Sequence, residues 1–333
     1  MTEIVSIVIP CFNEEKYIEN CIQSFLIQEY PSELIEILII DGGSTDDTLS
    51  IINKIQKKIS NIKVLSNPER ITPVSLNLGI KNATGKYILI ASAHSKFPSD
   101  YISILMGKLL EMNCDGIGGG IDTEVIKSTP ISEAIIKVLS SAYGVGNSDF
   151  RIKKNEILYV DTVPFGIYKK SLFEELGYYN EKLVRNHDIE FSKRLLRKSK
   201  KIVLVSHIRC TYYARETYRK FAQNAYKNGV WNILTFYITR RFNSLSIRHF
   251  IPLIFVSSLF FPLILSLFLS KYFLSISIVS LLTYLSFILY VSMGLKDKCA
   301  PVFYIFWGLI VLHFSYGFGS LVSLFRVDKL YKR

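Results

Sequence analysis

Cysteine is scarce in this sequence, with five among 333 residues, and an odd number. The five cysteines form no Cys-x-x-Cys pair, which argues against a disulfide framework and favours a reducing compartment. The chain also opens without a basic segment followed by a long apolar one, so we expect no signal peptide and a cytosolic N-terminal part. A chain of this length can bury a hydrophobic core large enough for stability without disulfide bonds.

Acidic residues are nearly missing between Ser192 and Phe250. This stretch holds 14 Lys or Arg and a single acid, Glu216, although the net charge of the whole chain is only +12. A basic block of this kind suits either nucleic acid or an anionic membrane surface. Because an apolar third follows directly, we expect a membrane partner and no nucleic acid.

Charged residues are rare from about residue 250 to 325. With 49% apolar residues and a mean hydropathy of +0.27, the chain is neither disordered nor wholly soluble. Three apolar stretches, at 250–270, 272–295 and 300–325, are each long enough to cross a hydrocarbon core of about 30 Å. The alternative is that these segments are helices buried inside a soluble protein. The apolar side chains, however, occur on all faces of each segment, which favours a membrane. We therefore predict transmembrane helices over 251–325.

The charged tail conflicts with three crossings. If residues 1–250 are cytosolic, three crossings place residues 326–333 outside the cell. That tail carries Arg326, Lys329, Lys332 and Arg333, which the positive-inside rule places in the cytosol. Either one apolar segment is re-entrant or interfacial, or the tail breaks the rule.

Strand-like and helix-like segments alternate in the N-terminal part. Short β-rich runs at 4–9, 35–40, 63–66 and 87–91 are separated by helical patterns at 15–28, 45–58 and 73–82. This order predicts an α/β fold with a mostly parallel, doubly wound sheet, in which ligands bind at the carboxyl ends of the strands. Those ends hold Pro10–Glu14, Asp41–Ser44 and Ser92–His94.

The Gly116–Gly120 run is not a phosphate-binding loop. No Gly-Lys-Ser/Thr follows it, and its spacing differs from a dinucleotide fingerprint. We predict a close-packed strand or turn instead.

Three motifs carry possible chemistry, although each alone is also explained as a helix cap. Asn13 follows the first strand and Asp41 ends the second, where a carboxylate can accept hydrogen bonds from a base or ribose. Asp188 lies in Asn186–Phe191, ahead of a helix whose N-terminus keeps a carboxylate ionised, as a general base requires.

With these motifs in this order, residues 4–235 resemble family 2 glycosyltransferases of the GT-A fold. The matches include Pro10 with Asn13-Glu14, Asp41, and the segment from Asn77-Leu78-Gly79 to Tyr87-Ile88. The resemblance implies a nucleotide-sugar donor bound by Pro10, Asn13, Glu14, Asp41, Ser92 and Ala93. It also implies that Asp188 is the catalytic base of an inverting transfer.

A narrower resemblance is to succinoglycan-type (ExoA-like) membrane glycosyltransferases. It rests on segments such as Arg185-Asn186-His187-Asp188 and the C-terminal run from His313 to Gly319. It implies a lipid-linked acceptor of the polyprenyl phosphate type. We expect the residues around the acceptor and its diphosphate to be Arg185, His187, Arg215, Gln223 and Trp231.

The metal motif departs from the family pattern. GT-A enzymes usually carry Asp-x-Asp after the fourth strand, and the ExoA-like pattern is Asp-Ala-His, whereas this chain has Ser92-Ala93-His94. His94 is the candidate ligand, and an imidazole suits Mn²⁺ better than Mg²⁺. The sequence therefore leaves the use of a divalent metal open, and basic side chains are the other means of neutralising the diphosphate.

The predicted organisation has four parts: a GT-A domain over 1–235, a basic juxtamembrane segment over 236–250, transmembrane helices over 251–325 and a basic tail over 326–333. The predicted function is glycosyl transfer at the cytoplasmic face of the cell membrane, in exopolysaccharide or glycan assembly. Two alternatives stay open. One is an inactive membrane scaffold of the same fold, and the other is a processive polysaccharide synthase.

Overall fold

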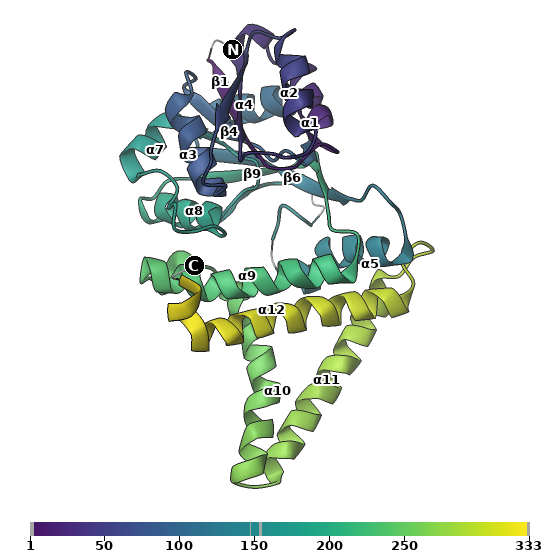
Figure 1. The fold of residues 1–333 in the computed structure, drawn as a ribbon. Helices are drawn as coiled ribbons and strands as arrows, with labels where there is room; N and C mark the ends of the chain where they lie inside the picture. The colour runs from purple at the N-terminus through teal and green to yellow at the C-terminus, as the bar shows by residue number, and fades with distance from the viewer. Residues whose placement is uncertain (1–2, 147, 153–154, 332–333) are drawn as a thin grey trace. The chain divides into compact units, whose positions relative to one another are not determined.

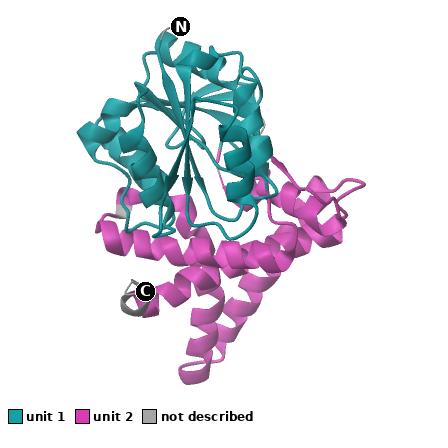
Figure 2. Ribbon diagram, turned by 45° about the horizontal axis from the view of Figure 1, so that its top comes forward, with its two compact units in different colours: residues 1–122, 149–213 teal, residues 123–148, 214–333 magenta. Residues whose placement is uncertain are grey.

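The computed structural model describes residues 3–146, 148–152 and 155–331. It divides into two compact units, residues 1–122 with 149–213 and residues 123–148 with 214–333 (Figure 2). In this division residues 123–148 and 214–235 are grouped with the C-terminal helices, and the predicted domain limits stay a prediction.

The first unit is built on one mixed sheet with strand order β3-β2-β1-β4-β8-β6-β9-β5, and β7 (Ile157–Tyr159) pairs with β9. The parallel half comprises β3 (Ile62–Ser66), β2 (Ile35–Asp41), β1 (Val5–Cys11) and β4 (Tyr87–Ile90). The antiparallel half adds β8 (Ile167–Lys169), β6 (Gly116–Glu124), β9 (Ile202–Tyr213) and β5 (Ser95–Lys96). The predicted α/β fold is therefore confirmed.

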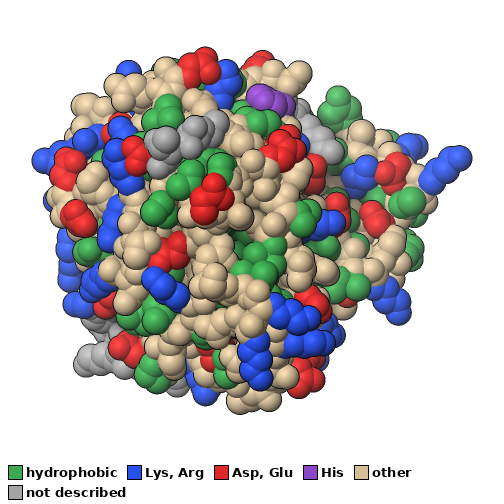
Figure 3. Space-filling model, turned by 90° about the horizontal axis from the view of Figure 1, so that it is seen from above, with side chains coloured by type: hydrophobic (Ala, Val, Ile, Leu, Met, Phe, Trp, Pro, Cys, Tyr) green, Lys and Arg blue, Asp and Glu red, His purple; other side chains and the backbone are tan. Residues whose placement is uncertain are grey.

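Helices cover both faces of this sheet (Figure 1). Those of the parallel half are α1 (Ile18–Leu26), α2 (Thr48–Gln56) and α3 (Thr72–Asn82); α4 (Tyr101–Glu111), α7 (Lys170–Leu176) and α8 (His187–Arg197) follow. Successive side chains along a strand point to opposite faces of the sheet, so the sheet has an apolar core on each face. Ile7 and Ile9 of β1 belong to one buried cluster, and Val8 belongs to the other. The surface seen from above carries acidic and basic side chains intermingled (Figure 3).

The glycine-rich run Gly116–Gly120 lies in strand β6, which agrees with the predicted close-packed strand or turn. A Cβ atom on Gly119 would lie 2.5 Å from the Ile208 carbonyl oxygen and 2.8 Å from the Tyr101 ring. Only glycine fits between that strand and that ring.

The second unit is helical. It contains α5 (Pro130–Leu139), α6 (Ala142–Val145), α9 (Tyr218–Thr239), α10 (Ile251–Phe268), α11 (Tyr272–Leu295) and α12 (Val302–Tyr331). Three segments, Ile247–Phe268, Tyr272–Leu295 and Val302–Val327, are long and apolar enough to cross a membrane. They coincide with the three apolar stretches predicted from the sequence.

Candidate functional site

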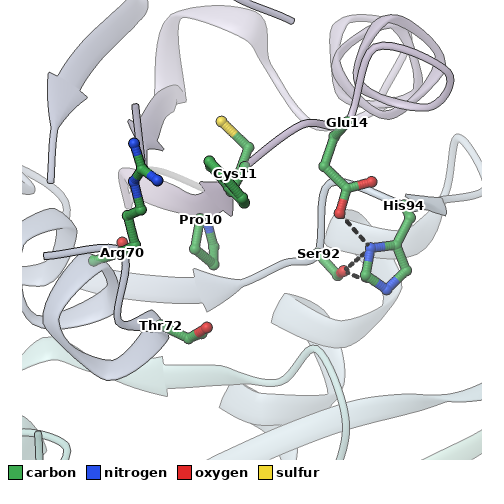
Figure 4. A pocket seen from close by; sticks show the side chains of 10 residues that line it. Pro10, Cys11, Glu14, Arg70, Thr72, Ser92 and His94 are labelled. Atoms are coloured by element: carbon green, nitrogen blue, oxygen red, sulfur yellow. Dashed lines mark hydrogen bonds and ion pairs between the residues drawn. The ribbon is translucent and has the colours of Figure 1, made fainter. Parts of the chain in front are cut away.

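A cavity of about 200 Å³ opens at the carboxyl ends of β1 and β4 (Figure 4). Register explains its position, because Cys11, Asp41 and Ser66 end three neighbouring parallel strands side by side. The cavity is lined by Pro10, Cys11, Phe12, Glu14, Gly42, Arg70, Thr72, Ser75, Ser92 and His94. Four residues predicted from the sequence, Pro10, Glu14, Ser92 and His94, therefore meet there.

Asn13 acts on the loop beside the cavity. Its backbone has a φ of 54°, and its side-chain oxygen accepts a hydrogen bond from the Thr45 amide at 2.8 Å. In return, its own amide donates to the Ser44 hydroxyl at 3.0 Å, and the Glu14 amide donates to the Thr48 hydroxyl at 2.8 Å. These bonds tie the turn after β1 to the loop after β2, and they fix the position of Glu14.

Asp41 is buried, and its carboxylate is directed into its own loop. It accepts hydrogen bonds from the Gly43 amide at 2.8 Å, the Ser44 amide at 3.1 Å and the Ser44 hydroxyl at 2.6 Å. Gly43 has a φ of 76°, which favours glycine. In this arrangement Asp41 shapes the loop that carries Gly42 to the cavity wall; its predicted contact with the donor stays a prediction. Ala93 is buried beneath the strand end.

Glu14, Ser92 and His94 form a polar cluster on one wall (Figure 4). The Glu14 Oε1 atom lies 3.0 Å from His94 Nδ1, and the Ser92 hydroxyl lies 3.3 Å from the ring. The Tyr212 ring meets the imidazole edge-on, with the ring centroids 5.1 Å apart, and holds its orientation. The chemistry of the cluster is one carboxylate, one hydroxyl and one imidazole.

Arg70 supplies positive charge to the opposite wall (Figure 4). Its guanidinium carbon lies 5.1 Å from the centre of the Phe12 ring, a cation–π arrangement that orients the side chain. Sequence reasoning missed Arg70, Thr72 and Ser75. The available signal was their proximity in the chain to Asn67-Pro68, where a turn leads from the end of β3 into α3. Phe12 lies within the predicted strand end Pro10–Glu14, but no role was assigned to it.

Asp188 is exposed and lies in the first turn of α8, two residues after Asn186, whose φ is 61°. Beside it, the His187 ring packs edge-on against Tyr179, and burial lowers the pKa of the imidazole. The nearby Asp188 charge opposes that shift and contributes to the raised pKa of Tyr168, whose main cause is burial.

Helix α3 connects the cavity with the segment before α8. Its first turn supplies Thr72 and Ser75 to the cavity. One turn further, the Asn77 amide exchanges two hydrogen bonds of 2.9 Å with the Tyr179 backbone and donates to Glu181 at 2.8 Å. The position of the loop that leads to Asp188 is therefore set by the same helix that lines the cavity.

The expected acceptor residues are divided between the two units. Arg185 and His187 lie in the first unit and are half-buried. Arg215, Gln223 and Trp231 belong to the second unit, where Arg215 and Gln223 are exposed and Trp231 is half-buried. Their role at an acceptor stays a prediction.

Residues 6–177 match the family described as glycosyl transferase family 2. The chain therefore belongs to this family. It is 35% identical, over 68% of its length and 71% of the relative's, to the dolichyl N-acetyl-alpha-D-glucosaminyl phosphate 3-beta-D-2,3-diacetamido-2,3-dideoxy-beta-D-glucuronosyltransferase of Methanococcus voltae. It is 26% identical, over 63% of each chain, to the succinoglycan biosynthesis protein ExoA of Rhizobium meliloti.

Among solved structures, the chain is similar to GalNAc-T7 with UDP, GalNAc and Mn²⁺. The TM-score is 0.51 and the identity 17%, and the match covers 64% of this chain and 44% of that one. This likeness concerns the fold, which is that of GT-A glycosyltransferases.

Proposed function

We propose that this glycosyltransferase transfers a sugar, with inversion, from a nucleotide-sugar to a lipid-linked acceptor. The observation that carries the proposal is the cavity at the ends of β1 and β4 in a family 2 chain. It combines a cationic wall at Arg70, an aromatic ring at Phe12 and the Glu14–His94 pair.

The donor's nucleotide lies in this cavity, with its diphosphate within reach of Arg70. A guanidinium is suited to this because it presents several donors in a fixed plane to phosphate oxygens. Asn13 and Asp41 support the two loops that border the cavity, while Pro10, Ser92 and Ala93 form the strand ends beneath it. UDP is the first nucleotide to test, because the GalNAc-T7 structure of the same fold contains it.

A divalent cation fits this site only together with the donor. Among the residues that the structure describes, no group of three His, Cys, Asp or Glu side chains is placed to hold a metal ion. The Glu14 Oε1 atom nevertheless lies 3.0 Å from His94 Nδ1 and the Ser92 hydroxyl 3.3 Å from it, and diphosphate oxygens would complete the set. A nitrogen ligand favours Mn²⁺ over Mg²⁺. A bound cation would offset the charge of the diphosphate.

Asp188 is the general base. Its carboxylate takes the proton from an acceptor hydroxyl while that oxygen forms a bond to the anomeric carbon. The bond from the anomeric carbon to the diphosphate oxygen breaks, and the nucleoside diphosphate leaves with the electron pair. Attack from the face opposite the leaving group inverts the anomeric centre.

The proposed acceptor is a sugar linked to a polyprenyl phosphate or diphosphate. The Methanococcus voltae relative is named for such a dolichyl phosphate substrate, and this chain has three helices apolar enough for a membrane. Arg185, His187, Arg215, Gln223 and Trp231 are the proposed contacts to the acceptor and its phosphate. We place the first unit on the cytoplasmic face of the cell membrane, in exopolysaccharide or glycan assembly.

A donor screen tests the proposal directly. The full-length protein in detergent is incubated with a panel of nucleotide-sugars, and thermal shift and donor hydrolysis are measured. We expect one nucleotide class to raise the melting temperature and to be hydrolysed or transferred to a polyprenyl-linked sugar. Nucleotide binding without turnover for any donor would favour the inactive scaffold, and several sugars added per acceptor would favour the processive synthase.

A further inference from the structure

Helices α9 and α12 run side by side in the second unit (Figure 1). The Tyr218 hydroxyl near the start of α9 donates to the Tyr304 carbonyl near the start of α12. Farther along, the Ser320 hydroxyl donates to the Gly229 carbonyl at 3.0 Å, and the Asn232 amide donates to the Tyr316 hydroxyl at 2.8 Å. The two helices are therefore joined over most of their shared length.

Two glycines bring the backbones of this helix pair into contact. A Cβ atom on Gly229 would lie 2.0 Å from the Tyr316 carbonyl oxygen, and one on Gly319 would lie 2.1 Å from the Tyr226 carbonyl oxygen. Small residues allow such close approach between helices. Since the backbones touch, α12 must lie at the same membrane depth as α9.

Helix α9 cannot lie in hydrocarbon. Its exposed surface carries Arg219, Lys220 and Lys227, together with the amide of Gln223. One Lys or Arg at the centre of a spanning helix costs about 2.5–3.5 kcal/mol on the insertion scale, so three cations make a crossing strongly unfavourable. Because α12 is joined to α9 along this length, α12 does not cross either.

Helices α10 and α11 have a different setting. They form a hairpin that extends away from the α9–α12 pair, and α12 lies across the end of this hairpin rather than parallel to it (Figure 1, Figure 2). Apolar side chains are exposed along the hairpin, among them Ile254, Phe268, Tyr290 and Val279. Its two apolar segments, Ile247–Phe268 and Tyr272–Leu295, have 22 and 24 residues and are about 33 and 36 Å long, enough for a hydrocarbon core of about 30 Å.

We infer that only the α10–α11 hairpin crosses the membrane, and that α9 and α12 lie together along the bilayer surface. Exposed apolar side chains of α12, such as Trp307, then enter the acyl boundary, and the cations of α9 meet lipid phosphates. Two crossings return the chain to the side it left. Residues 326–333 are then on the same side as residues 1–250, which satisfies the positive-inside rule that three crossings violate.

Cysteine labelling of the full-length protein distinguishes two crossings from three. The only exposed cysteine among the five, Cys299, is changed to serine, and the four buried ones are retained. One variant in this background carries a cysteine appended after Arg333, and another carries Lys271→Cys at the tip of the hairpin. Spheroplasts of bacterial cells expressing each variant are treated with a membrane-impermeant maleimide, before and after permeabilisation.

We expect Lys271→Cys to be labelled in intact spheroplasts, and the appended cysteine only after permeabilisation. Labelling of both in intact spheroplasts would establish a third crossing and overturn the inference. Protection of Lys271→Cys in intact spheroplasts would overturn it as well, because the hairpin would not cross. Nucleotide binding by the same variants is measured separately, so that a failed topology is not confused with a failed donor site.

Discussion

The imidazole of His94 and the carboxylate of Glu14 meet at 3.0 Å across 80 residues of chain. His94 occupies the place after β4 where the family usually has the last acid of Asp-x-Asp, and Glu14 comes from the turn after β1. The pair thus brings a carboxylate next to a histidine at a strand end, Ser92–His94, that holds no acid of its own.

Glu14→Gln should weaken Mn²⁺ binding in the presence of UDP, since it removes the only carboxylate of the cluster with Ser92 and His94. Electron paramagnetic resonance of Mn²⁺ gives the bound fraction with and without UDP, and we expect binding only with UDP. Ser92→Asp should raise the affinity, because it adds a hard oxygen ligand.

Glu15→Gln is the matched control, because Glu15 is the neighbouring acid and its carboxylate accepts from the Asp47 amide outside the cavity. Equal Mn²⁺ binding by wild type and Glu14→Gln would show that Glu14 is no ligand. If chelation by EDTA also leaves transfer unchanged, and His94→Ala is fully active, the diphosphate is neutralised by basic side chains alone.

Arg70→Ala should weaken UDP binding by about 1.5–3 kcal/mol, the usual worth of a hydrogen bond to a charged group. Arg70→Lys keeps the charge but loses the planar contact with Phe12 and the paired donors, so it should lie between wild type and Arg70→Ala. Calorimetry with UDP measures all three. An unchanged dissociation constant for Arg70→Ala would remove this residue from the donor site.

Asp188→Asn should reduce transfer on the order of 10²–10⁴-fold, the typical contribution of a general base. UDP affinity should stay within about twofold, since the carboxylate acts on the acceptor proton. Glu174→Gln, an exposed acid on α7, is the control for a change of surface charge. Transfer by Asp188→Asn at a rate near that of wild type would assign the base elsewhere.

The sequence identified the strand ends because hydrophobic runs and their terminal polar residues are local signals. It placed Glu14, Ser92 and His94 at one edge because parallel strands end together. It missed Arg70, which lies in an irregular turn without periodicity. It also began the second helix near Thr45, whereas α2 starts at Thr48, since the loop before it is held by Asn13 from the turn after the neighbouring strand β1.

The division into units was equally hidden from local patterns. The apolar face of α5 packs against helices that come about 80 residues or more later in the chain. Ile135 of α5 shares one buried cluster with Phe221 of α9 and Ile305 of α12. Hydropathy likewise identified α12 as a membrane segment without showing which helix it packs against. Such relationships depend on tertiary contacts, which residue periodicity does not encode.

Asp41→Ala should lower both thermal stability and donor affinity. The substitution leaves the Gly43 and Ser44 amides without their acceptor, which costs about 1–3 kcal/mol where such groups are buried. Asp41→Asn, which keeps one acceptor oxygen, should be affected less. Thermal melting and UDP calorimetry are compared. A large loss of affinity with an unchanged melting temperature would mean that Asp41 contacts the donor directly and does not act through its loop.

Gly319→Ala should destabilise the helical unit, because the added methyl group would meet the Tyr226 backbone of α9 at 2.1 Å. Backbone atoms do not yield as a flexible side chain does, so the free energy of unfolding should fall by about 1–3 kcal/mol.

The matched control is Gly294→Ala in α11, where nothing lies within 4 Å and alanine favours the helix. Thermal unfolding of the full-length protein in detergent, followed by the circular dichroism signal of α-helix, is measured for both variants. The expected order of melting temperature is Gly294→Ala at or above wild type, and Gly319→Ala below both. If Gly319→Ala melts with wild type, α9 and α12 are not in backbone contact, and the reason for keeping α12 out of the membrane is lost.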